Sequence, residues 1–167
     1  MLKVCDILNV IPIGIEIDYY VPINIIFGEW DPSIEPTACW YTGNLKNTLL
    51  EVGLGEEKGK IRFITLVGIK DIRKDTVKIS CDKVLTGLPA FETKAYNEKN
   101  LLVEEPGPLK MIIDQNNVYI LFSDNEIDSE IICGQVAFFL DKDNFFCGVK
   151  VENLSDSEIQ FLEDNFL

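Results

Sequence analysis

Acidic side chains carry the conventional acid–base chemistry that this sequence offers. The chain has 28 Asp and Glu residues, 15 Lys and Arg residues and no histidine. Without histidine there is no Ser–His–Asp or Cys–His catalysis, and no imidazole is present to bind a metal ion. General acid–base work would therefore depend on carboxylates that the fold brings together.

Six acidic residues near the C-terminal end form the strongest candidate for such a group. They are Asp124, Glu126, Asp128, Glu130, Asp141 and Asp143. The first four occupy every second position, so an extended chain would place them on one face. Carboxylates grouped in this way are typical of a glycosidase-like pair, of a calcium site or of a solvated acidic surface. The residues after Asp141 lack the ending of a calcium loop, so we expect neither a metal ion nor a cofactor.

The acidic residues are concentrated in the last quarter of the chain. From Asp124 to Leu167 there are 11 acidic residues and two lysines, a net charge of −9, while the whole chain carries −13. Such a surface either steers a basic partner or serves solubility alone. It argues against nucleic-acid binding, which needs clustered Lys and Arg, and Arg62 and Arg73 are the only arginines. We therefore expect a basic protein partner and no nucleic acid.

Both tryptophans lie in a segment that is rich in turn-forming residues. Residues 28–43 contain Trp30, Trp40, Tyr41 and two prolines, which is typical of a loop held by aromatic side chains. Exposed aromatic residues anchor many protein interfaces. Aromatic rings can also stack against sugars. The other interpretation is that these three rings belong to the core or only anchor the loop.

Neither the cysteines nor the glycines indicate a further site. The five cysteines are Cys5, Cys39, Cys81, Cys133 and Cys147. They have no C-x-x-C spacing and no histidine to activate a thiol, so we expect buried thiols in a reducing compartment. Residues 53–59 form a glycine-rich turn. Glu56 and Glu57 lie within it and would repel a phosphate, so we expect no nucleotide there.

Strands are the main elements expected to position these residues. Apolar residues alternate with other residues from 11 to 19, and nearly so to 27, which indicates strands with one exposed face. Residues 48–54 and 60–67 flank an acidic turn with glycines at both ends and predict a β-hairpin. A further strand is expected over 77–85.

The second half of the chain repeats the hairpin pattern. Residues 109–113 and 118–122 flank the sequence Asp-Gln-Asn-Asn, and residues 130–140 and 145–151 flank Asp-Lys-Asp-Asn. Both turn sequences tolerate the left-handed backbone that tight hairpins need, so each pair predicts a hairpin. Residues 87–108 contain three prolines and are expected to connect the two halves.

The end of the chain predicts a short helix. Ser155 is a good N-cap, and Glu158 follows three residues later, which is the pattern of a capping box. Leu154 and Ile159 occupy the positions of a hydrophobic staple. Ile159, Leu162 and Phe166 share one apolar stripe, so the helix should pack on the sheet.

These elements predict an α+β fold, in which a mostly antiparallel β-sheet built from hairpins carries a C-terminal α-helix. We expect a single domain over residues 1–167, with possible halves 1–86 and 109–167 joined by the proline-rich connection 87–108. No segment approaches the roughly 20 apolar residues that cross a membrane. The first residues also lack the pattern of a signal peptide. The expected location is the cytoplasm, without membrane contact.

Two parts of the sequence resemble small bacterial proteins of the immunity type. They are TLLEVGL at 48–54 with GKIRFITLV at 59–67, and FFLD at 138–141 through GVKVENLS at 148–155. Immunity proteins of polymorphic or contact-dependent toxin systems are often small, acidic and cytosolic, and they block a basic toxin domain by binding it. The resemblance therefore implies an inhibitor without enzymatic activity and without shared catalytic residues.

The leading expectation is a cytosolic immunity protein that neutralises a basic toxin domain by steric and electrostatic occlusion. The candidate partner-binding residues are Asp124, Glu126, Asp128, Glu130, Asp141, Asp143, Trp30, Trp40 and Tyr41. One alternative is a β-rich module that binds a small ligand or a carbohydrate through residues 28–43. The others are a structural domain and a hydrolase with two converging carboxylates.

Overall fold

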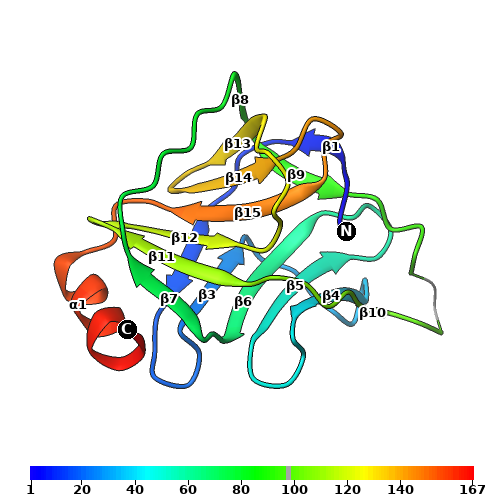
Figure 1. The fold of residues 1–167 in the computed structure, drawn as a ribbon. Coiled ribbons are helices and arrows are strands. Elements are labelled where there is room, and N and C mark those ends of the chain that lie inside the picture. Colours follow the sequence, from blue (N-terminus) through cyan, green and yellow to red (C-terminus); the bar gives the residue numbers. More distant parts are fainter. Residues whose placement is uncertain (97–98) are drawn as a thin grey trace.

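Two large β-sheets make up most of the computed structural model, which describes residues 1–96 and 99–167 (Figure 1). The six-stranded sheet has the order β10-β4-β5-β6-β3-β2, and the seven-stranded sheet has the order β7-β11-β12-β15-β14-β13-β8. The strands of the six-stranded sheet are β2 (Ile13–Glu16), β3 (Ile23–Phe27), β4 (Thr37–Gly43), β5 (Leu49–Gly55), β6 (Ile61–Gly68) and β10 (Leu102–Glu104). Those of the seven-stranded sheet are β7 (Asp71–Lys74), β8 (Lys83–Thr86), β11 (Lys110–Asp114), β12 (Asn117–Leu121), β13 (Ser129–Cys133), β14 (Val136–Leu140) and β15 (Phe146–Val151). A two-stranded ribbon of β1 (Val4–Leu8) and β9 (Leu88–Phe91) and the helix α1 (Asp156–Phe166) complete the fold.

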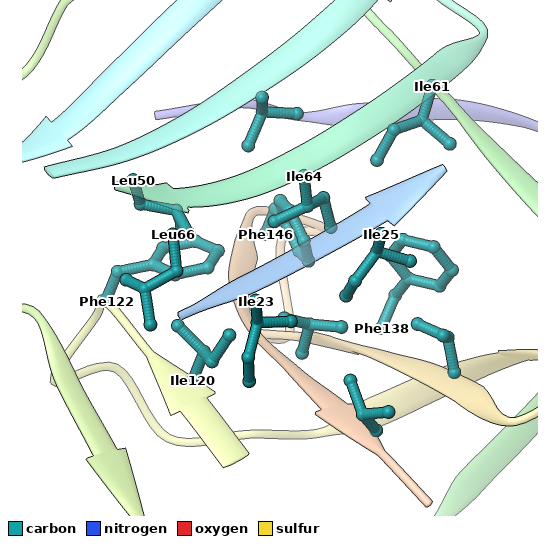
Figure 2. Packing of buried hydrophobic residues seen from close by; sticks show 14 of the residues in the cluster. Ile23, Ile25, Leu50, Ile61, Ile64, Leu66, Ile120, Phe122, Phe138 and Phe146 are labelled. Carbon is teal, nitrogen blue, oxygen red and sulfur yellow. The ribbon is translucent and has the colours of Figure 1, made fainter. Parts of the chain in front are cut away.

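The hydrophobic core lies between the two sheets. Alternation along each strand turns one set of side chains inward, as in β3, where Ile23, Ile25 and Phe27 are at most 1% exposed. Figure 2 shows aliphatic side chains of the six-stranded sheet packed against aromatic and aliphatic side chains of the other sheet. The rings of Phe27 and Phe138 meet across this core with centroids 5.5 Å apart. Burial of these apolar faces is the main force that holds the sheets together.

The ribbon closes one end of the space between the sheets. On its β1 side, the backbone of residues 2–4 hydrogen-bonds to residues 144 and 146, next to the turn between β14 and β15. On its β9 side, the Phe91 N–H donates to the Gly59 carbonyl in the turn between β5 and β6. Gly59 has φ +63°, and a Cβ there would lie 1.7 Å from the Phe91 oxygen, so this contact requires glycine.

The C-terminal helix forms as the sequence predicts. The Ser155 side chain accepts a hydrogen bond from the Glu158 N–H at 3.2 Å, and the Glu158 carboxylate accepts one from the Ser155 N–H at 2.8 Å. Ile159 and Leu162 are buried and belong to the core cluster. Figure 1 shows α1 beside β7, and Lys74 of β7 forms an ion pair with Glu163 of α1 at 2.6 Å. The prediction of a capped C-terminal helix is therefore confirmed.

Parallel strand pairs correct part of the fold prediction. An α+β fold rich in antiparallel strands is confirmed, but β10, β7 and β8 pair in parallel with β4, β11 and β13. All three are edge strands, and each has only three or four residues. A hairpin can only produce an antiparallel pair, so parallel pairing needs a longer connection elsewhere in the chain. The sheets are therefore mixed and are not built from hairpins alone.

Several strand boundaries also differ from the expectation. The predicted hairpin of residues 48–67 forms as β5 and β6, and the hairpin of 109–122 forms as β11 and β12. Residues 28–43 are not one loop, because they contain β4, and the 87–108 connection contains β9 and β10. The stretch 130–140 is two strands with a turn at Gly134, and only the end of 77–85 is a strand.

Residues 75–82, which we call the strap, connect the two edges of the seven-stranded sheet. The strap leaves β7 at one edge and enters β8 at the other. Six inter-strand spacings of about 4.8 Å give roughly 29 Å. Eight linking residues cover that distance only when nearly extended. The strap is held at both ends, since the Asp75 N–H donates to the Ile113 carbonyl and the Asp82 N–H to the Asp128 carbonyl.

Candidate functional site

An acidic hollow of about 660 Å³ lies where the strap, the loop before β13 and the turn between β14 and β15 meet. Its lining residues are Ser80, Asp82, Asn125, Glu126, Ile127, Asp128, Asp141, Lys142 and Asp143. Four of the six acidic residues predicted from the sequence therefore border one concavity. Asp82 is a fifth acidic residue, which the sequence analysis did not single out.

Asp141 fixes the shape of one wall of the hollow. The Asp141 side chain is largely enclosed, and its Oδ1 accepts the backbone N–H groups of Asp143 and Phe145, both at 2.9 Å. Its Oδ2 accepts the Asn125 amide at 2.7 Å, which ties the turn to the neighbouring loop. Asn144 adopts the left-handed φ of 66° that such a turn needs. Asp141 therefore stabilises this wall of the hollow, and both of its carboxylate oxygens already accept hydrogen bonds.

The opposite wall is fixed by backbone pairing. The parallel register of β8 on β13 aligns Lys83 with Ser129, which places the preceding residues Asp82 and Asp128 side by side. The Asp82 N–H donates to the Asp128 carbonyl at 3.2 Å, and the Asp128 N–H donates to the Leu140 carbonyl at 2.9 Å. Two acidic residues that are far apart in the sequence are therefore held at one rim by main-chain hydrogen bonds.

The exposed carboxylates of the hollow have little positive charge to balance them. Asp82, Glu126, Asp128 and Asp143 are all exposed, and Lys142 is the basic residue among the lining residues. Within residues 1–96 and 99–167, the ion pairs involve none of these four carboxylates. Like charges gathered around a concavity attract cations and basic proteins, and the walls focus the field. The hollow is therefore suited to binding a positively charged group.

The remaining predicted residues do not line the hollow. Asp124 is exposed and outside the lining of the hollow. Glu130 lies on β13, where its negative charge contributes to raising the pKa of Cys81. Trp40 is 2% exposed, packs against Phe122 with ring centroids 5.6 Å apart and donates its indole N–H to Glu105. Since its ring belongs to the core, Trp40 offers no surface to a partner or to a sugar in this structure.

Tyr41 lies on β4 of the six-stranded sheet, and Trp30 lies in the loop between β3 and β4. Trp30 is partly exposed and packs against Phe63 of β6, with ring centroids 6.0 Å apart. The Tyr41 hydroxyl donates to Glu51 at 2.9 Å on the neighbouring strand β5. The predicted acidic and aromatic residues therefore do not form one site. Four of the six predicted acidic residues line the hollow, and these two rings lie against the six-stranded sheet.

The cysteines divide by exposure. Cys133 and Cys147 are buried as expected, whereas Cys39 and Cys81 are partly buried and Cys5 is exposed, so the expectation of buried thiols does not hold for Cys5. Burial raises the pKa of Cys147, and burial with the neighbouring Glu51 raises the pKa of Cys39 to about 12. Both thiols therefore stay protonated near neutral pH and are poor nucleophiles.

Comparison with known proteins gives no family for this chain. No protein-family model matches it, and no curated protein matches its sequence. In the part of the chain that the structure describes, no helix is both long and apolar enough to span a membrane. The same part contains no group of three or more Cys, Asp or Glu side chains arranged to hold a metal ion. The acidic hollow must therefore be interpreted from its own geometry and charge.

Cys81 provides a chemical probe of the charge beside the hollow. We expect the double variant Asp128→Asn, Glu130→Gln to raise the rate of alkylation of Cys81 by iodoacetamide at pH 8 by about three- to tenfold. In the wild type, partial burial and the negative charges of Glu130, Asp128 and Asp82 raise the pKa of Cys81. Removing two of these charges lowers that pKa, so more of the thiol is the reactive thiolate. Peptide mass spectrometry gives the rate at each cysteine.

Cys5 is the internal control for this measurement. Its pKa is raised by burial, Glu92 and Asp6, none of which the double variant changes, so its alkylation rate should stay constant. Raising the ionic strength should speed the reaction of wild-type Cys81, because salt screens the same charges. An unchanged Cys81 rate in the double variant would show that these carboxylates create no strong negative potential there.

Proposed function

We propose that this chain is a non-enzymatic binding protein that uses the acidic hollow to bind a basic protein partner. In its most concrete form, it is an immunity protein that neutralises a cognate toxin domain, as the resemblance in its sequence implies. One observation carries the proposal: three segments, distant in sequence, place Asp82, Glu126, Asp128 and Asp143 around one concavity, and none of the four forms an ion pair with another described residue.

The proposed mechanism has two steps, attraction of the basic partner and then coverage of the partner's active site. The net charge of −13, concentrated toward the C-terminal quarter, attracts a basic domain over distances comparable with the Debye length, roughly 8–10 Å at physiological salt. The hollow then accepts Lys or Arg side chains of the partner, where carboxylates replace their hydration. The body of the fold covers the partner's surface around this contact and so blocks access to its active site. Charged rim residues of this kind act mainly on the association rate.

The arrangement of rigid and free carboxylates supports this division of roles. Asp141 is bonded inside its turn and holds the wall in place, while the four exposed carboxylates have no ion-pair partner among the described residues. Gathering like charges in a folded domain costs stability through mutual repulsion. Binding of a basic partner relieves this repulsion, and the relief favours the complex. We infer that the acidic set is kept for this contact, beyond a need for solubility.

Differential capture from the native organism's lysate tests the proposal. The hollow variant carries Asp82→Asn, Glu126→Gln and Asp143→Asn. The control variant carries Glu56→Gln, Glu57→Gln and Glu104→Gln, three acidic residues outside the hollow. Both variants have the same net charge, so a difference between them isolates the place of the charges. We expect wild-type and control baits to retain one basic protein at low salt and release it at high salt, and the hollow variant to lose it.

The purified captured protein then provides the functional readout. Wild-type and control chains should inhibit its activity at stoichiometric concentrations, and the hollow variant should need at least about tenfold more. Equal capture and inhibition by all three baits would refute a role for the hollow. Recovery of each bait alone, with the lysate proteins shown to be present, would contradict a protein-binding function.

A further inference from the structure

The outer face of the six-stranded sheet carries a polar row of side chains. Strand register aligns Glu16, Asn24, Thr65, Glu51 and Tyr41 across β2, β3, β6, β5 and β4. Neighbours in this row hydrogen-bond to one another: Asn24 donates to Glu16 at 3.0 Å and Thr65 donates to Asn24 at 2.8 Å. The Tyr41 hydroxyl donates to Glu51 Oε1 at 2.9 Å. These bonds hold the polar groups in fixed orientations at the surface.

An aromatic surface lies directly beside the polar row. Phe63 pairs with Gly53 on β5, and a Cβ at position 53 would lie 2.2 Å from the Phe63 ring, so the ring covers the glycine. Trp30 packs against Phe63 with centroids 6.0 Å apart and 32° between the ring planes. Glycine at position 53 therefore allows two aromatic rings to lie together over the sheet next to Glu51.

These two features border one shallow pocket of about 320 Å³. Its lining residues are Asn24, Ile26, Trp30, Glu51, Phe63 and Thr65. Glu51 is the charged residue among these six, and Glu16 continues the polar row toward β2. The pocket shares no lining residue with the acidic hollow, which belongs to the other sheet. It combines aromatic rings, one carboxylate and two neutral polar groups in a small space.

We propose that this pocket, which we call the arginine pocket, binds the guanidinium group of an arginine side chain on a protein ligand. The plane of the guanidinium would stack on Trp30 and Phe63, and its N–H groups would donate to Glu51. Aromatic rings attract cations through their negative faces, and a carboxylate held nearby adds a charge-assisted hydrogen bond. The negative pocket and the positive group are complementary in charge, which selects this occupant over a neutral one.

The chemical groups that line the pocket favour arginine over lysine. A guanidinium is planar and weakly hydrated, so it stacks on rings while it donates in its plane, whereas an ammonium is a compact and strongly hydrated charge. The Tyr41 hydroxyl orients the Glu51 carboxylate in advance. Asn24 and Thr65 can meet the remaining N–H groups. This inference goes beyond the proposed function and does not depend on it, because the hollow and the arginine pocket use different residues.

The test uses N-acetyl-arginine amide as the probe and the full chain as the protein. We expect saturable binding with a dissociation constant of the order of 1–10 mM, seen as a change in tryptophan emission. Trp40 is 2% exposed in the core, so Trp30 is the tryptophan that reports on the pocket. The matched neutral probe is N-acetyl-citrulline amide, which has nearly the same shape without the charge. It should bind at least about tenfold more weakly, and the lysine analogue should bind more weakly than arginine.

Two variants test the residues that carry the proposal. Glu51→Gln keeps an acceptor for Tyr41 and should weaken arginine binding at least about fivefold, while Glu57→Gln outside the pocket should leave it unchanged. Trp30→Leu should abolish binding, as read by saturation-transfer NMR of the probe. Equal binding of arginine and citrulline would overturn the proposal, and so would the absence of binding at 50-fold the expected constant. The hollow variant should bind the arginine probe normally, so failure of one proposal leaves the other testable.

Discussion

Replacing Phe146 by alanine is expected to lower the free energy of unfolding by about 3–5 kcal/mol. Phe146 is fully buried on β15, and its ring lies 4.8 Å from that of Phe122, 5.3 Å from that of Phe91 and 5.8 Å from that of Phe138. These partners come from the seven-stranded sheet, from the loop after β12 and from the ribbon. Truncation therefore opens a cavity where the ribbon meets the core, and surrounding rings can fill it only in part.

Phe145 provides the matched control for this substitution. It is the adjacent residue, but it is only partly buried, and its ring lies under the Lys3 amine, 5.4 Å away. Phe145→Ala should cost less than about 1.5 kcal/mol. Urea unfolding of both variants gives the comparison. Equal losses would show that the core does not depend on the aromatic cluster around Phe146.

Replacing Arg62 by methionine is expected to lower the free energy of unfolding by about 2–4 kcal/mol. Arg62 is 4% exposed, and its Nη1 donates to the Glu35 and Pro36 carbonyls at 2.9 and 3.1 Å and to the Thr37 hydroxyl at 2.7 Å. Its Nη2 donates to the Glu35 carboxylate at 2.7 Å. Methionine fills similar volume but removes all four of these hydrogen bonds, and among the described residues only the Pro36 carbonyl and the Glu35 carboxylate keep another donor, the backbone N–H groups of Glu56 and Glu57. Because the Glu35 side chain is 31% exposed, water restores part of its solvation, which limits the loss.

The same substitution should have a local signature. Arg62 ties β6 to the backbone carbonyls of Glu35 and Pro36 and to the Thr37 hydroxyl, so hydrogen exchange in residues 29–36 should accelerate more than exchange in β11 to β15. Lys60→Met, in the turn before β6, is the control and should change stability by less than about 0.5 kcal/mol. A loss below 1 kcal/mol for Arg62→Met, with unchanged exchange at 29–36, would contradict the role assigned to Arg62.

Local signals in the sequence predict the elements that depend on nearby residues. The hairpin of β5 and β6 follows from alternation and a turn with glycine at both ends, and α1 follows from the Ser155–Glu158 capping box. Both elements depend on residues close in sequence, so a short stretch of sequence contains the whole pattern that predicts them. The same holds for the turn of β11 and β12, where Gln115 takes the left-handed φ of 54°.

The parts that sequence reasoning missed depend on contacts between distant residues. β7, β8 and β10 are short, partly exposed and poorly alternating, and they are strands only because β11, β13 and β4 lie beside them. The two prolines before β4 favoured a loop over residues 28–43, so this strand was not predicted. Trp40 points inward on that strand, since residues at even positions of β4 face the core.

The candidate site shows the same limit. The alternating acids at 124–130 suggested one face of a strand, but residues 122–128 precede β13, and only Glu126 and Asp128 of this group line the hollow. Their neighbours Asp141 and Asp143 come from the turn between β14 and β15. Asp82 comes from the strap, and no local pattern marks it, because its place depends on the crossing from β7 to β8.

The decisive measurement for the role of the acidic hollow is the association rate of the purified partner with the hollow variant. We expect the hollow variant to associate at least about tenfold more slowly than the control variant at low salt, with a smaller dependence on ionic strength. The dissociation rates of the two variants should differ much less. If the hollow and control variants associate at the same rate and respond equally to salt, the acidic hollow is not the surface that recognises the partner.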